Sequence, residues 1–163
     1  MGMQCALYAA SEAAARQVLE DPEALSDVFR GDPLSKRAVR LEKSWHGLHF
    51  VFTGSAWEGN EPLNFLLGGG EPVGDAGDEE EAPARVLLPD FVRKLKKALD
   101  GISRDEFERR FDLEKLEEAE IYPEIWDEEL ADLLEEYGMY FDNLKQFVDG
   151  AAERGDAILV LLG

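Results

Sequence analysis

The sequence predicts a helix-rich α+β domain with a small sheet that includes both chain ends. Residues 4–9 are apolar and favour a strand near the start, and residues 157–162 form an uninterrupted apolar run at the end. Between them, apolar residues recur mostly at three- and four-residue spacing, which is typical of helices with one buried face. A chain of 163 residues is long enough to bury one substantial core, and no linker divides it. We therefore expect residues 1–163 to form a single domain.

The first third of the chain is expected to continue from a strand into helices. After the strand Gln4–Ala9, Ser11 is a typical N-cap for a helix over Ala13–Glu20. Asp21 and Pro22 favour the start of a second helix to about Arg30, followed by a turn over residues 31–33. We predict that the next helix is a single long one over residues 35–53, because its apolar residues recur at helical spacing and Gly54 can cap its end: Leu34, Ala38, Leu41, Trp45, Leu48 and Phe52.

The middle of the chain alternates between short elements and an acidic loop. Residues 62–67 are predicted to form a short apolar helix, and residues 68–83 an irregular loop rich in glycine, proline and acids. A brief strand is expected over Arg85–Leu88, and a helix over Pro89–Leu99.

Capping residues mark the remaining helices. Ser103 and Glu106 have the spacing of a capping box, and Asp112 is expected to cap a helix to about Glu120. A long helical region follows Tyr122-Pro123, with a potential break at Gly138 and an end at Gly155. The terminal strand over residues 157–162 is apolar throughout, so we expect it at the centre of the sheet and paired with the first strand.

The charge balance narrows the classes of partner. Acidic residues outnumber basic ones by 36 to 17, which gives a net charge of −19. Long-range repulsion of this size argues against nucleic acids and anionic membranes, and it favours a basic protein or a small ligand. Residues 105–136 alone hold fifteen acids and three bases, a pattern of either a solvated helical face or a docking surface.

The single cysteine, Cys5, and the absence of a basic, apolar leader favour a cytoplasmic location. No apolar run is long enough to cross a bilayer. The oligomeric state is left open by the sequence.

The two histidines are the residues that invite a chemical hypothesis. His46 and His49 lie one turn apart beside Trp45, so they could share a metal, act as acid and base, or be structural. The sequence contains no His-Glu-x-x-His motif, Cys/His ligand set, phosphate loop or nucleophile elbow, so we expect no metal and no cofactor. Structural histidines are the preferred interpretation. Tyr122 and Trp126 form an aromatic pair that either packs in the core or lines a pocket. Arg85 lies between the acidic loop and a strand, where its charge can balance the acids around it.

Several landmarks together resemble the YfbM-like family of bacterial proteins, a domain of unknown function. They follow in order along nearly the whole chain: Met1-Gly2-Met3, Lys43-Ser44-Trp45-His46-Gly47-Leu48-His49-Phe50, Pro83-Ala84-Arg85, Ile121-Tyr122-Pro123 with Trp126, and Ala151-Ala152 before Gly155. The resemblance implies a compact α+β cytoplasmic domain of bacterial origin. It implies no activity and no catalytic residues.

Two functional hypotheses remain at this point. The first is a non-catalytic acidic interaction or ligand-binding domain, a version of which is an immunity-type protein that masks a basic toxin. The second is a small hydrolase or metal-dependent enzyme that uses His46 or His49 near an aromatic pocket. Both draw on the same ligand-pocket candidates: Trp45, His46, His49, Arg85, Tyr122 and Trp126.

Overall fold

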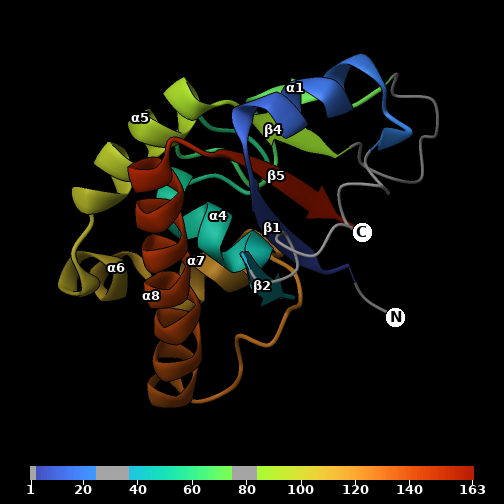
Figure 1. The fold of residues 1–163 in the computed structure, drawn as a ribbon. Helices are drawn as coiled ribbons and strands as arrows, with labels where there is room; N and C mark the ends of the chain where they lie inside the picture. The colour runs from blue at the N-terminus through green and yellow to red at the C-terminus, as the bar shows by residue number, and fades with distance from the viewer. Residues whose placement is uncertain (1–2, 25–36, 75–83) are drawn as a thin grey trace.

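The computed structural model describes residues 3–24, 37–74 and 84–163, and its centre is a five-stranded antiparallel sheet (Figure 1). The strands lie in the order β2-β1-β5-β4-β3. Their bounds are β1 (Cys5–Ala10), β2 (Ala38–Glu42), β3 (Glu71–Pro72), β4 (Arg85–Leu87) and β5 (Ala157–Leu162). The α+β class and the sheet made from both chain ends are confirmed.

The terminal strand β5 lies in the middle of the sheet, as its apolar sequence predicts. It pairs with β1 along its whole length, from Cys5 opposite Leu162 to Ala10 opposite Ala157, and with β4 on its other side. Residues 157–160 of β5 are buried on both faces. A strand without a polar side requires this central position, because either face would otherwise expose apolar surface.

Helices cover both faces of the sheet (Figure 1). One face packs on the main core, which contains residues of the five helices α4, α5, α6, α7 and α8. The opposite face packs on α1 through a smaller cluster that includes Ala15 and Val18. The described helices are α1 (Glu12–Glu20), α4 (Trp45–Thr53), α5 (Pro89–Asp100), α6 (Arg104–Arg110), α7 (Leu113–Glu118) and α8 (Leu130–Arg154). Among the described residues, no helix is both long enough and apolar enough to span a membrane.

The predicted caps are confirmed by their hydrogen bonds. The Ser11 hydroxyl accepts from the Ala14 amide, and the Ser103 hydroxyl accepts from the Glu106 amide. The Asp112 carboxylate accepts from the amides of the first turn of α7. Gly155 ends α8 in the left-handed conformation, with φ of 72°. Short-range hydrogen bonding fixes these helix ends, which is why the local sequence is sufficient to locate them.

The single helix predicted over residues 35–53 is wrong. Residues 38–42 form strand β2, and only residues 45–53 are helical. Val39 and Leu41 are buried at alternate positions, and β2 pairs with β1. The chain then turns at Glu42, with φ of 51°, and the Ser44 hydroxyl donates to the Leu41 carbonyl. Over so few residues the apolar spacing fits a strand and a helix equally well, and pairing with β1 decided the outcome.

Two further predictions need correction. Residues 62–67 form turns rather than a helix. Helix α8 continues through Gly138 without a break. The missing side chain at Gly138 makes room for Arg104, whose Nη1 donates to the Gly138 carbonyl at 3.2 Å. Within the predicted loop, residues 71–72 form β3. The remainder of that loop (75–83), most of the predicted second helix and the turn over residues 31–33 lie outside the described residues.

Candidate functional site

Helix α4 places both histidines in the interior. Seven of its nine residues are buried, including Trp45, His46 and His49. Gly47 allows α8 to approach closely, because a Cβ at this position would lie 2.7 Å from a ring carbon of Tyr137. The helix is therefore surrounded by protein, as its apolar sides predict.

His46 is held by hydrogen bonds at both ring nitrogens. Its Nδ1 accepts from the Tyr122 amide at 2.9 Å, and its Nε2 lies 2.8 Å from the Ala56 carbonyl oxygen. An amide can only donate and a carbonyl can only accept, so the proton resides on Nε2 and the imidazole is neutral. Burial lowers the pKa of His46, and the hydrogen bond to Ala56 opposes this effect.

His49 is less completely bonded. Its Nε2 donates to the Glu58 carbonyl at 2.9 Å, whereas its Nδ1 is buried with no hydrogen-bond partner among the described residues. Burial lowers the pKa of His49 to about 4. Together the two imidazoles bind alternate carbonyls of the segment 54–59 and thus fasten this segment to α4.

Four aromatic rings form a column that ends at the surface. Tyr122 stacks on Trp45 with ring centroids 5.6 Å apart, and Trp45 stacks on His46 at 5.0 Å. Trp57 lies 4.3 Å from His46 and is 67% exposed. The Trp45 indole is itself fixed by donation to the Met3 carbonyl. The column presents one rigidly supported tryptophan to solvent.

Trp126 lies on the other side of Gly47, next to Tyr137 and Phe111. Its Nε1 donates to the Ile121 carbonyl at 2.8 Å. It also lines a surface cavity of about 420 Å³ together with three carboxylates: Glu117, Glu124 and Asp127. Such a cavity suits a positively charged side chain.

Arg85 lies on β4, away from the ring column. Its Nη1 donates to the carbonyls of Gly68 and Gly69, which fixes the glycine turn against the sheet. Burial lowers the pKa of Arg85 to about 10, and the positive charge of Arg85 contributes to the low pKa of His49. Arg85 thus lowers the pKa of His49 through its charge, and its hydrogen bonds hold the glycine turn at Gly68 and Gly69.

Three of the six predicted residues lie on α4 and two pack near it, and the six do not form one open pocket. Trp45, His46 and Tyr122 are in ring contact or hydrogen-bonded, His49 is one turn further on, Trp126 lies behind Gly47, and Arg85 lies on the sheet. Neither imidazole lines any of five cavities formed by the described residues. In the described ranges, no group of three or more histidine, cysteine, aspartate or glutamate side chains is placed to hold a metal. These surroundings suit structural histidines.

Cys5 is also poorly suited to chemistry. It is buried, and burial raises the pKa of its thiol to about 12. The thiol is therefore protonated at neutral pH, whereas a nucleophile requires the thiolate.

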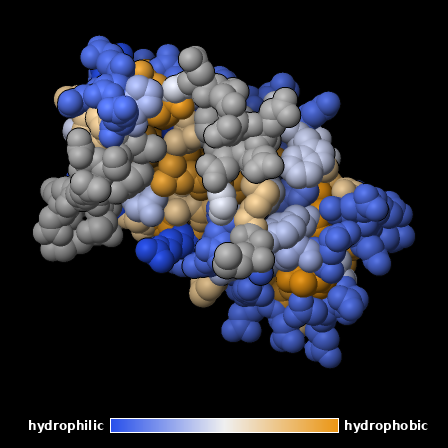
Figure 2. Space-filling model, turned by 90° about the vertical axis from the view of Figure 1, so that its right-hand side faces the viewer, coloured by the Kyte–Doolittle hydropathy of each residue, from blue (hydrophilic) through white to orange (hydrophobic). Residues whose placement is uncertain are grey.

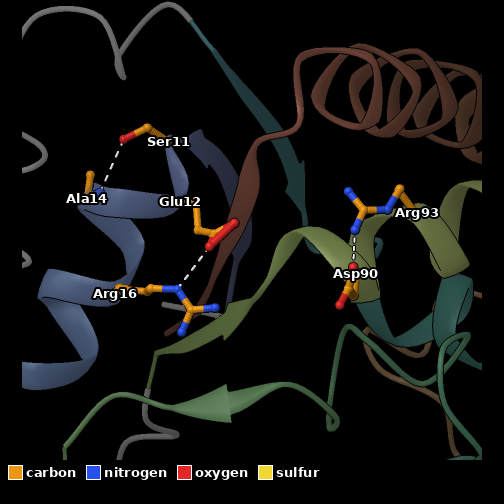
Figure 3. Close-up of polar contacts among 6 residues, drawn as sticks. All are labelled: Ser11, Glu12, Ala14, Arg16, Asp90 and Arg93. Carbon is orange, nitrogen blue, oxygen red and sulfur yellow. Dashed lines mark hydrogen bonds and ion pairs between the residues drawn. The ribbon is translucent and has the colours of Figure 1, made fainter.

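A cavity of about 410 Å³ lies between α1 and α5, with Arg16 and Arg93 among its lining residues (Figure 3). Each arginine is paired with an acid of its own helix: Arg16 with Glu12 at 3.0 Å, and Arg93 with Asp90. The remaining charged residues of the lining, Glu61 and Glu71, are acidic. The local charges of this cavity are thus already balanced or negative.

Trp57 is the exposed residue that the sequence analysis missed. It lies in a polar, turn-rich segment outside any apolar pattern. A large aromatic residue in such a segment has no helical or strand face to join, and this isolation was the available signal.

The comparisons with known proteins agree on the fold. A family model described as "Domain of unknown function (DUF1877)" matches residues 1–161. A crystal structure of YfbM, a protein of unknown function from Escherichia coli, is similar with a TM-score of 0.75 and 20% identity, and the match covers 98% of this chain and 99% of that one. None of the curated proteins matches the chain. The resemblance to YfbM-like proteins noted in the sequence is confirmed.

Proposed function

Because the chain belongs to the DUF1877 family, whose description assigns no activity, we propose a function from the chain's own geometry. We propose that it is a non-catalytic interaction domain that binds a basic protein through the surface around Trp57 and the acidic segment 117–127. We place this interaction in the bacterial cytoplasm. The exposed indole of Trp57 at the end of a fixed ring column is the observation that carries the proposal.

A supported tryptophan is a favourable anchor for a partner. Tryptophan is enriched among the residues that dominate binding energy at interfaces. One side of the Trp57 ring packs on His46, whose two nitrogens are bonded to the protein, so the indole lies on a fixed support. An exposed indole of this kind can stack with a guanidinium or ammonium group.

The charges near this surface favour a basic partner. Glu58 and Glu61 are exposed on the segment that carries Trp57. The cavity beside Trp126 adds three carboxylates, and its segment is joined to α4 by the bond from the Tyr122 amide to His46. On the face drawn in Figure 2, hydrophilic residues lie mostly toward the outer edges and apolar residues are exposed between them. Complementary charge of this kind increases the association rate and excludes acidic partners.

Backbone geometry supports a role for the carboxylates of this segment. Glu120 and Glu124 have φ of 54° and 61°, in the left-handed region that glycine adopts more readily. Glutamate is present at these positions despite its higher conformational energy. We therefore include these two carboxylates in the proposed binding surface.

The proposal is tested by affinity capture from a bacterial lysate at low and high salt. We expect a basic protein to be retained at low salt and released at high salt, because salt screens exposed charges. Trp57→Ala is expected to reduce capture at least about tenfold, as expected for loss of an interface anchor. Leu130→Ala is the matched control, since Leu130 is an exposed apolar residue on α8. Equal capture by both variants, or no basic protein at either salt, contradicts the proposal.

Glu124→Gly separates binding from folding. Glycine relieves the left-handed backbone, so urea unfolding should show equal or higher stability. Removal of the carboxylate should weaken partner capture. Lower stability together with unchanged capture would show that Glu124 has only a structural role. An immunity-type function additionally requires a one-to-one complex, which light scattering of the purified complex can measure.

A further inference from the structure

A basic groove between β2 and α8 contrasts with the overall charge of the protein. The groove has a volume of about 510 Å³ and its lining includes three arginines and two amides: Arg37, Arg40, Arg154, Asn143 and Gln146. Among the described residues, no acidic side chain lines it. Basic residues are only 17 of the 53 charged ones, so a lining with three arginines and no acid departs from the composition.

The arginines retain capacity for an anionic partner. Arg37 and Arg154 share one carboxylate, that of Asp156, at 3.5 and 2.8 Å. Two guanidinium groups on a single carboxylate leave a net positive charge. Arg40 is exposed and takes part in none of the ion pairs formed among the described residues. Asn143 and Gln146, both exposed on α8, add amide groups that can donate hydrogen bonds.

The same groove runs along an edge of the sheet. Strand β2 is terminal in the strand order of the described residues and pairs only with β1 there. The Ala9 amide donates to the Arg37 carbonyl, so the backbone carbonyl of Arg37 points toward β1. Hydrogen-bonded and non-hydrogen-bonded pairs alternate along an antiparallel ladder, so the amides and carbonyls of Ala38 and Arg40 point away from β1. An unpaired edge of this kind can accept an additional strand.

We propose that this groove binds an extended acidic peptide segment of another protein, which pairs with β2 as an added strand and places its carboxylates against Arg37, Arg40 and Arg154. This site is separate from the surface around Trp57 and takes a partner of opposite charge. Carboxylates bind arginine through paired hydrogen bonds, and the strand edge supplies main-chain bonds. Nucleic acid fits less well, because it has no peptide amides and carbonyls to pair with the edge of β2.

The test is an NMR titration of the ¹⁵N-labelled full chain with a ten-residue peptide that has glutamate at both odd and even positions, so that an added strand presents carboxylates on both faces. The peptide is added up to about 1 mM so that weak binding is detected. We expect saturable shifts that are largest at the amides of Ala38 and Arg40. Two control peptides separate the contribution of the carboxylates from that of the main-chain hydrogen bonds. One has glutamine in place of glutamate, and the other has proline at alternate positions, which removes N–H donors. Each control is expected to bind at least about tenfold more weakly.

The protein variants are chosen to leave the fold intact. Arg40→Gln removes a guanidinium that forms no ion pair among the described residues. This variant should weaken binding of the glutamate peptide at least about tenfold. Arg109→Gln is the control, since Arg109 is 74% exposed on α6 and lies outside the groove. The proposal is overturned by absent binding, by equal effects of the two variants, or by a proline peptide that binds as well as the original. Equal binding of inorganic phosphate or of an oligothymidylate with the same Arg40 dependence also overturns it, because it would identify a simple anion site.

Discussion

The histidines of α4 and the arginines beside β2 lie close together in the sequence but in opposite environments. His46 and His49 are buried, and each donates to a carbonyl of the segment 54–59. Arg37 and Arg40 are exposed beside the edge of β2 with which no described strand pairs. The hydrogen bonds of the two imidazoles hold the segment 54–59 to α4, whereas Arg40, which forms no ion pair among the described residues, is available to another molecule. The histidines, which first suggest chemistry, are thus bonded within the fold, whereas the proposed binding rests on less conspicuous residues.

The largest effect is expected from His46→Leu. Leucine fills the space but leaves the Tyr122 amide and the Ala56 carbonyl without their partner. Loss of two partly buried hydrogen bonds should lower the free energy of unfolding by about 2–4 kcal/mol. Urea unfolding measures the change, with Trp57→Ala as a comparison that should cost clearly less. If His46→Leu costs no more than Trp57→Ala, the structural role of His46 is refuted.

The second-largest effect is expected in the pH dependence of the free energy of unfolding, to which His49 contributes. The pKa of His49 falls from 6.5 in the unfolded chain to about 4 in the folded protein. Below pH 6.5 the unfolded state therefore binds more protons, so the stabilisation present above pH 6.5 is lost as the pH falls toward 4. The loss approaches roughly 3 kcal/mol, since one pKa unit corresponds to about 1.4 kcal/mol.

His49→Gln isolates this contribution. Glutamine can still donate to the Glu58 carbonyl but does not titrate between pH 7 and 4. Chemical unfolding at several pH values should show a shallower loss of stability for the variant than for the wild type. Parallel curves for the two proteins would mean that His49 titrates equally in both states.

The smallest effect is expected from Arg40→Gln. Arg40 is exposed and forms no ion pair among the described residues. The substitution should therefore change the free energy of unfolding of the protein by less than about 0.5 kcal/mol. Thermal and urea unfolding can be compared with those of Arg109→Gln. A larger loss of stability for Arg40→Gln would show that the groove contributes to folding. The arginine groove would then resemble the buried histidines in supporting the structure.

The histidines illustrate how far the candidate site could be predicted. Their burial and structural role follow from an apolar helix with few polar sides, which the residues after Ser44 display. Their hydrogen-bond partners could not be predicted, because Ala56 and Tyr122 act through backbone atoms that any residue possesses. Trp57 and the arginine groove were missed for a related reason. Exposure and the proximity of β2 to α8 depend on how distant segments pack.

The sequence by itself determined the caps at Ser11, Ser103 and Asp112, the end of α8 at Gly155 and the central position of β5. Each depends on hydrogen bonds within one turn or on an apolar run with no polar side. Only the tertiary structure decided that residues 38–42 form a strand, that α8 passes unbroken through Gly138, and that the imidazoles face the segment 54–59. In these cases the local preference is nearly balanced, so contacts with β1, Arg104 and backbone carbonyls distant in the chain select one conformation.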